Sequence, residues 1–120
     1  MPERAPTMSL PTQTIAPDFC VSPQLQPEAM ALAAQAGFRS VINNRPDFEG
    51  GPEQPTHAQM EAAAHAAGLE YRHLPVNGSY QSPEEIVQFH QLLSSLPKPI
   101  LAFCRSGARS TRLYAAASVL

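Results

Sequence analysis

The sequence lacks several features on which whole classes of protein depend. It has no tryptophan and only two cysteines, Cys20 and Cys104, which are too few for a disulfide framework and typical of a reducing compartment. No apolar run reaches the ~18 residues that a membrane span needs, and the first residues show no signal-peptide pattern. We therefore expect a cytoplasmic protein with no membrane partner.

Charge is also scarce. Charged residues make up 15% of the chain, and its 8 lysines and arginines are dispersed rather than gathered in a basic patch, so we expect no nucleic-acid partner. The 4 histidines form no tight ligand cluster in the sequence, and Cys104 is assigned below as a nucleophile rather than a metal ligand. We therefore expect no metal site. No motif indicates an organic cofactor, and none is expected.

Proline, by contrast, is abundant. Many of the 13 prolines fall in the first half of the chain, and they predict a flexible leader over residues 1–11. Residues 12–120 are long enough for one domain with a core of its own. The last helical pattern reaches Leu120 without a cap signal, which predicts that the native chain continues C-terminally.

Short apolar runs alternate with helical patterns along the chain. We predict strands over 15–21, 38–43, 69–76 and 100–103, and helices over 27–36, 56–67, 83–95 and 110–120. The fold class predicted from this order is α/β, with a mostly parallel sheet of four to five strands and helices on both faces. Right-handed crossovers between parallel strands place the helices there.

The stretch from Ile100 to Thr111 carries the clearest chemistry. An apolar strand stops at Cys104 and is followed by a small-residue loop and a helix start. Inward-pointing loop amides and a helix N-terminus attract an anion and lower a thiol pKa from ~8.5 to roughly 3.5–7.5. We therefore predict that Cys104 is a nucleophile within an anion-binding loop, formed by Arg105, Ser106, Gly107, Ala108, Arg109 and Ser110.

The alternative is that Cys104 is a small buried residue at the end of a strand, with both arginines of the loop solvated. Cys20 lies in an apolar stretch far from any loop signature, so we assign it to the core. A second polar loop, Asn44 to Pro55, follows a predicted strand at the ligand-bearing edge of the sheet. Within this loop, Arg45 either presents its planar guanidinium group to an oxyanion or forms a surface ion pair with Asp47.

Three segments taken together resemble a known family. Residues 39–47, 74–78 and 104–110 are similar to the protein-tyrosine-phosphatase-like domain of the bacterial beta-lactamase-hydrolase-like family, and the resemblance covers about residues 10 to 120. It implies a fold like that of dual-specificity phosphatases. Members of the family occur alone or fused to metallo-hydrolase or persulfide-oxidising domains. The resemblance therefore implies a metallo-hydrolase or persulfide dioxygenase as a partner, fused or separate.

Three positions depart from a true tyrosine phosphatase. The phosphate-binding arginine of that family would fall at Ser110, but arginine stands one place earlier, at Arg109. Phe103 replaces the histidine that usually precedes the nucleophile, and Asn77 stands near the place of an acidic aspartate. A Cys-x4-Arg loop instead resembles that of single-domain rhodaneses, whose shorter loop suits a persulfide. Attack of a thiolate on sulfane sulfur requires no general acid.

We therefore predict a sulfurtransferase in which Cys104 becomes a persulfide and Arg105 or Arg109 steers an anionic donor such as thiosulfate. The alternative is a phosphatase that acts on a phosphoester, with Cys104 as the nucleophile, Arg109 on the phosphate, and Asp47 or Glu49 as the acid. A second alternative is an inactive module that binds an anion or docks to a partner. In each case the small ligand is an anion.

Overall fold

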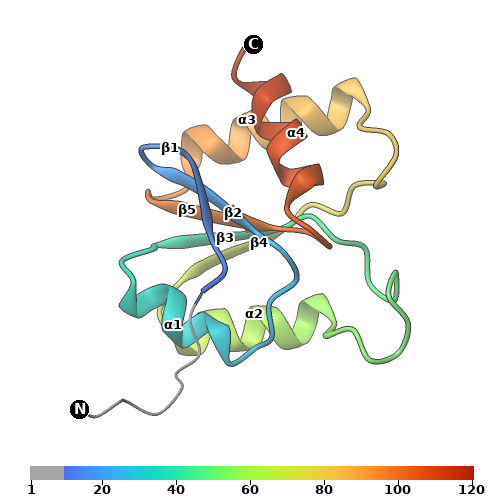
Figure 1. Cartoon of the computed structure of the whole chain (residues 1–120). Coiled ribbons are helices and arrows are strands. Elements are labelled where there is room, and N and C mark those ends of the chain that lie inside the picture. Colours follow the sequence, from blue (N-terminus) through green and yellow to red (C-terminus); the bar gives the residue numbers. More distant parts are fainter. Residues whose placement is uncertain (1–9) are drawn as a thin grey trace, which may run out of the picture.

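The computed structural model describes residues 10–120, so the leader predicted over residues 1–11 lies almost wholly outside the described residues. Helices cover both faces of a central sheet (Figure 1). In chain order the elements are β1 (Gln13–Ala16), β2 (Phe19–Ser22), α1 (Ala29–Gln35), β3 (Ser40–Asn43), α2 (His57–Ala66), β4 (Glu70–His73), α3 (Pro83–Ser95), β5 (Ile100–Phe103) and α4 (Ala108–Ala117).

The sheet has five strands in the order β1-β2-β5-β3-β4, and every neighbouring pair except β1–β2 is parallel. The predicted fold class is therefore confirmed. Strand β5 is central, because Ile100 pairs with Phe19 on one side and with Ser40 on the other. The loop that begins at Cys104 thus leaves from the middle of the carboxyl edge, where ligands bind in sheets of this kind.

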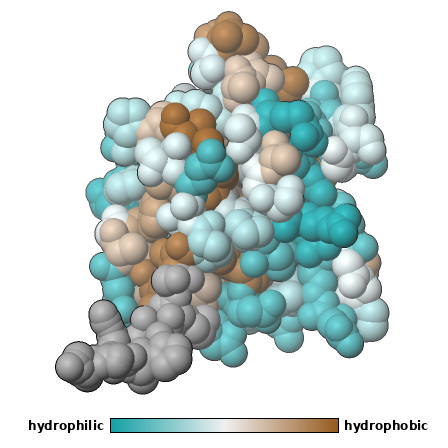
Figure 2. All heavy atoms as spheres, in the orientation of Figure 1, coloured by the Kyte–Doolittle hydropathy of each residue, from teal (hydrophilic) through white to brown (hydrophobic). Residues whose placement is uncertain are grey.

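The core is divided between the two faces of the sheet by the alternation of side chains along each strand. In β5, Leu101 and Phe103 pack with α1 and α2, whereas Ile100 and Ala102 pack with α3 and α4. Figure 1 shows the two pairs of helices on opposite sides of the sheet. Hydrophilic residues gather on the right of the same view in Figure 2, on the side where the loops of the carboxyl edge lie in Figure 1.

Helices α2 and α3 each begin with a capping box. The side chain of Thr56 accepts from the N–H of Gln59 at the start of α2, and that of Ser82 accepts from the N–H of Glu85 at the start of α3. Each box satisfies N–H groups that the first turn of a helix leaves without partners. These two helices therefore begin where the sequence predicts.

Several elements differ from the prediction. The strands predicted over 38–43 and 69–76 are shorter, at Ser40–Asn43 and Glu70–His73. The stretch 15–21 is not one strand but part of a hairpin, in which Pro17 and Asp18 form the turn between β1 and β2. Helix α1 begins at Ala29 rather than at Pro27. Helix α4 spans Ala108–Ala117 rather than 110–120, so the second arginine of the loop lies in its first turn.

Candidate active site

The loop after β5 wraps its backbone around the sulfur of Cys104. Its turn is made at Gly107, whose φ of 95° belongs to the left-handed region that favours glycine. The N–H of Gly107 donates to Sγ of Cys104 at 3.0 Å. Cys104 is 1% exposed, so its sulfur lies beneath the loop at the N-terminus of α4.

The surroundings of this sulfur favour the thiolate. Burial by itself raises the pKa of Cys104, because an apolar environment disfavours a charge. Contacts with the N–H and the side chain of Ser110, and hydrogen bonds from the N–H groups of Gly107 and Ser106, together outweigh that effect. The pKa of Cys104 is therefore lowered below the ordinary value of a thiol, as a nucleophile requires.

A buried asparagine ties this loop to the neighbouring strand. Oδ1 of Asn44 accepts from the hydroxyl of Ser110 at 2.8 Å, and its Nδ2 donates to the carbonyl of Leu74 at 3.0 Å. Its backbone N–H donates to the carbonyl of Phe103 at 2.8 Å. Sequence reasoning missed Asn44 as a site residue, although its position directly after β3 was an available signal.

One carboxylate oxygen joins two buried arginines. Oε1 of Glu49 lies 2.8 Å from Nε of Arg45 and 3.1 Å from NH2 of Arg109. NH1 of Arg109 donates to the carbonyl of Val76 at 3.0 Å. Arg45 is buried and pairs with Glu49, so the alternative of a surface pair with Asp47 is wrong.

The candidate acids are engaged in other contacts. Burial raises the pKa of Glu49, but hydrogen bonds from Arg45 and Arg109 dominate and lower it below the ordinary value, so Glu49 is ionised at neutral pH. Oδ1 of Asp47 accepts from the backbone N–H of His57 at 2.8 Å, at the start of α2. Both carboxylates are thus held by other groups in this structure, and an acid role for either one stays a prediction.

A polar cavity of about 700 Å³ brings together five of the predicted site residues, whereas Cys104, Asp47 and the rest of the loop are not among the residues that line it. Asn77 is exposed there and its Oδ1 accepts from the N–H of Ser79 at 2.7 Å. Among the other predicted residues, Ser106 and Ala108 are exposed on the loop. The residues that line the cavity are Arg45, Glu49, Gly50, Asn77, Gly78, Ser79, Arg105 and Arg109.

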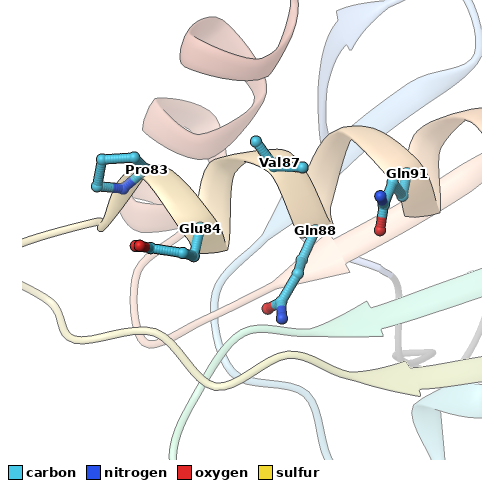
Figure 3. Close-up of a pocket in the computed structure, with 5 residues that line it drawn as sticks. All are labelled: Pro83, Glu84, Val87, Gln88 and Gln91. Carbon is cyan, nitrogen blue, oxygen red and sulfur yellow. The ribbon is translucent and has the colours of Figure 1, made fainter.

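Other parts of the surface offer less chemistry. A shallower hollow of about 450 Å³ runs along α3, and all its lining side chains come from that one helix (Figure 3). Glu84 is the one titratable side chain among them. Within residues 10–120, no group of three or more His, Cys, Asp or Glu side chains gathers as metal ligands, and no helix is long and apolar enough to cross a membrane.

A cysteine at the end of a central parallel strand, with its sulfur enclosed by the loop amides before a helix, defines a thiol-based, phosphatase-like α/β domain. The family model described as "Beta-lactamase hydrolase-like protein, phosphatase-like domain" matches residues 12–120. The chain belongs to this family, which confirms the resemblance stated from the sequence.

Individual relatives agree with this assignment. The chain is 42% identical over 84 residues to a beta-lactamase hydrolase-like protein of Agrobacterium fabrum, covering 70% of this chain and 19% of the relative. It is 36% identical over 102 residues to one of Xylella fastidiosa, covering 85% and 23%. The chain therefore spans about a fifth of the length of these curated relatives.

A solved structure shows the same fold. The crystal structure of a candidate phosphatase from Neisseria meningitidis superimposes with a TM-score of 0.78 at 32% identity, covering 84% of this chain and 71% of that chain. The comparisons thus favour the phosphatase-like alternative over the sulfurtransferase prediction, which they do not support.

Proposed function

We propose that this domain is a cysteine-dependent phosphatase-like hydrolase for small phosphorylated anions whose leaving group departs without protonation. The observation that carries the proposal is the hydrogen bond of 3.0 Å from the N–H of Gly107 to Sγ of Cys104, within a loop that lowers the pKa of this thiol. The buried Arg109 beside the loop supplies positive charge for an anion. The phosphatase-like description of the family supports the same class of reaction.

The proposed reaction has two steps, and in each of them one bond to phosphorus forms while another breaks. The Cys104 thiolate attacks phosphorus, forming the S–P bond while the bond from phosphorus to the leaving oxygen breaks. The leaving group departs with the electron pair of that bond. A water molecule then attacks phosphorus and loses its proton to solvent, while the S–P bond breaks and its electron pair returns to sulfur. This step releases inorganic phosphate and restores the thiolate. The loop amides and Arg109 stabilise the negative charge throughout.

The predicted restriction on the leaving group follows from the residues near the cavity. Glu49 is ionised, and an amide such as Asn77 cannot protonate an alkoxide. Aryl phosphates and phosphoanhydrides release anions that are stable in water without a proton. We therefore expect such substrates to react and alkyl phosphates to react poorly.

Sulfane-sulfur transfer is the second candidate, and the length of the loop favours it. Only four residues separate Cys104 from Arg109, which is the Cys-x4-Arg spacing that resembles single-domain rhodaneses. With thiosulfate, the thiolate would attack the outer sulfur and expel sulfite with the electrons of the S–S bond. Sulfite is a stable anion, so this reaction also needs no acid.

One experiment distinguishes the two reactions. Wild type and Cys104→Ser would be incubated separately with an aryl phosphate and with thiosulfate, and the intact mass measured after an acid quench. A phosphatase gains a phosphoryl group on Cys104 and releases phosphate steadily. A persulfide that dithiothreitol removes, with negligible phosphate release, would replace the proposal by the sulfurtransferase. No adduct and no turnover with either compound would leave the inactive anion-binding module.

A further inference from the structure

We propose that Glu49 occupies the anion subsite of Arg45 and Arg109 in the free protein, and that a tetrahedral dianion displaces it where a carboxylate monoanion does not. Glu49 is then a specificity-determining residue that selects doubly charged tetrahedral groups. This inference rests on the proposed function for the position of the substrate anion, but it concerns binding rather than turnover.

The geometry is that of a bound anion. A single oxygen of Glu49 lies within hydrogen-bond distance of two guanidinium groups, at 2.8 Å from Arg45 and 3.1 Å from Arg109. The two arginine side chains keep only 10% and 8% of their exposure. Two buried guanidinium groups that share an acceptor require negative charge between them, and any anion of suitable shape meets that requirement.

Two glycines cover the guanidinium groups from the loop side. A Cβ atom at Gly50 would lie 2.7 Å from NH2 of Arg45, and one at Gly78 would lie 3.1 Å from NH2 of Arg109. The backbone therefore approaches each arginine more closely than a side chain would allow. Each guanidinium group also has a partner other than Glu49, since Arg45 donates to Oε1 of Gln24 at 3.1 Å and Arg109 to the carbonyl of Val76 at 3.0 Å, so both remain at the cavity when the acceptor between them changes.

Glu49 leaves part of this site unused. In the described part of the chain, Nε of Arg109 is buried and has no hydrogen-bond partner. A buried N–H group normally has an acceptor, so this donor is free for a ligand. A tetrahedral dianion presents more oxygens than the single one by which Glu49 bridges the arginines. It can therefore form more charge-assisted hydrogen bonds, and carries more charge, than a carboxylate monoanion with its two oxygens.

The bridging carboxylate is also the part of this cluster that can move. The Glu49 side chain keeps 28% of its exposure, much more than either arginine. It follows Phe48, which is 65% exposed and has a φ of 65° in a turn at the surface. Glu49 can thus rotate into solvent without disturbing buried side chains once another anion takes its place between the two arginines.

Anion titrations followed by amide NMR test this inference. Inorganic phosphate, at a mildly alkaline pH where it is a dianion, and acetate would be added at constant ionic strength while the Gly50 and Gly78 signals are observed. Wild type should bind phosphate and not acetate. Glu49→Gln should bind phosphate at least about fivefold more tightly, since the competing charge is gone, and should also bind acetate.

Glu53→Gln is the matched control, because Glu53 is an exposed carboxylate of the same loop, and it should behave as wild type. Unchanged or weaker phosphate binding by Glu49→Gln, with an unchanged melting temperature, would overturn the inference and make Glu49 a positioning residue for Arg109. If Glu49→Gln lowers the melting temperature, Glu49→Asp tests the same point: the shorter side chain bridges less well and should also bind phosphate more tightly. Binding as expected without phosphatase turnover would reject only the proposed function.

Discussion

The hydroxyl of Ser110 donates to Oδ1 of Asn44 at 2.8 Å, and both side chains are fully buried. Ser110 also contributes to the lowered pKa of Cys104. One residue of α4 thus links the nucleophile to the segment after β3, which carries Arg45 and Glu49. The charge state of the sulfur and the position of the arginine cluster therefore depend on the same buried contact.

Ser110→Ala should raise the pKa of Cys104 and destabilise the domain. The variant leaves Oδ1 of Asn44 buried without a donor, which costs about 1–3 kcal/mol. Chemical denaturation measures the free energy of unfolding, and the pH dependence of alkylation measures the pKa. Ser118→Ala, at the exposed end of the same helix, should change neither. If Ser110→Ala behaved like that control, the role assigned to Ser110 would be wrong.

Cys104 should react as a thiolate at a lower pH than an ordinary thiol does. Since its pKa is lowered, the alkylation rate in a Cys20→Ala background should reach half its maximum below the ~8.5 of an ordinary thiol and stay high above that midpoint. Cys20 is half-buried on β2, with its sulfur 3.6 Å from the hydroxyl of Thr14, so this background should keep wild-type turnover. A midpoint at or above the ordinary value contradicts the assignment of Cys104 as nucleophile.

Gly107→Ala should both strain the loop and weaken the thiolate. At a φ of 95° a residue with a Cβ costs roughly 1–2 kcal/mol, and relief of that strain turns the N–H away from Sγ of Cys104. Gly37→Ala is the control, because Gly37 has a φ of 101° with no atom within 4 Å of an added Cβ. Both variants should lose stability in denaturant, and only Gly107→Ala should raise the pKa of Cys104.

Asn77→Asp should broaden the range of leaving groups if the domain is a phosphatase. The carboxyl would line the same cavity and still accept from the N–H of Ser79, so the loop should keep its shape. A general acid contributes at least about a hundredfold where a leaving group needs a proton, so the ratio of kcat/KM for alkyl over aryl phosphate should rise. An unchanged ratio, with both activities retained, would show that position 77 lies outside reach of the leaving oxygen.

Local signals in the sequence were sufficient for most of the fold. The two capping boxes, at Thr56 and Ser82, place helix starts by hydrogen bonds that reach only three residues ahead. The apolar run that ends at Cys104 is an equally local signal, which indicates a buried strand followed by a polar loop. The start of α4 was predicted too late, because no side chain caps it and it begins at Gly107 through backbone conformation alone.

Contacts between residues far apart in the sequence could not be predicted from such local signals. Glu49 lies between Arg45, four positions earlier in the chain, and Arg109, sixty positions later. No rule of sequence spacing predicts that these two arginines meet. They meet because β3 and β5 are parallel neighbours whose carboxyl ends share one edge of the sheet. The sequence by itself determined the candidate nucleophile, its loop and the α/β alternation, since each depends on residues close along the chain. Only the tertiary structure decided that Glu49 is ion-paired with Arg45 and Arg109, because strand order sets which charges are neighbours.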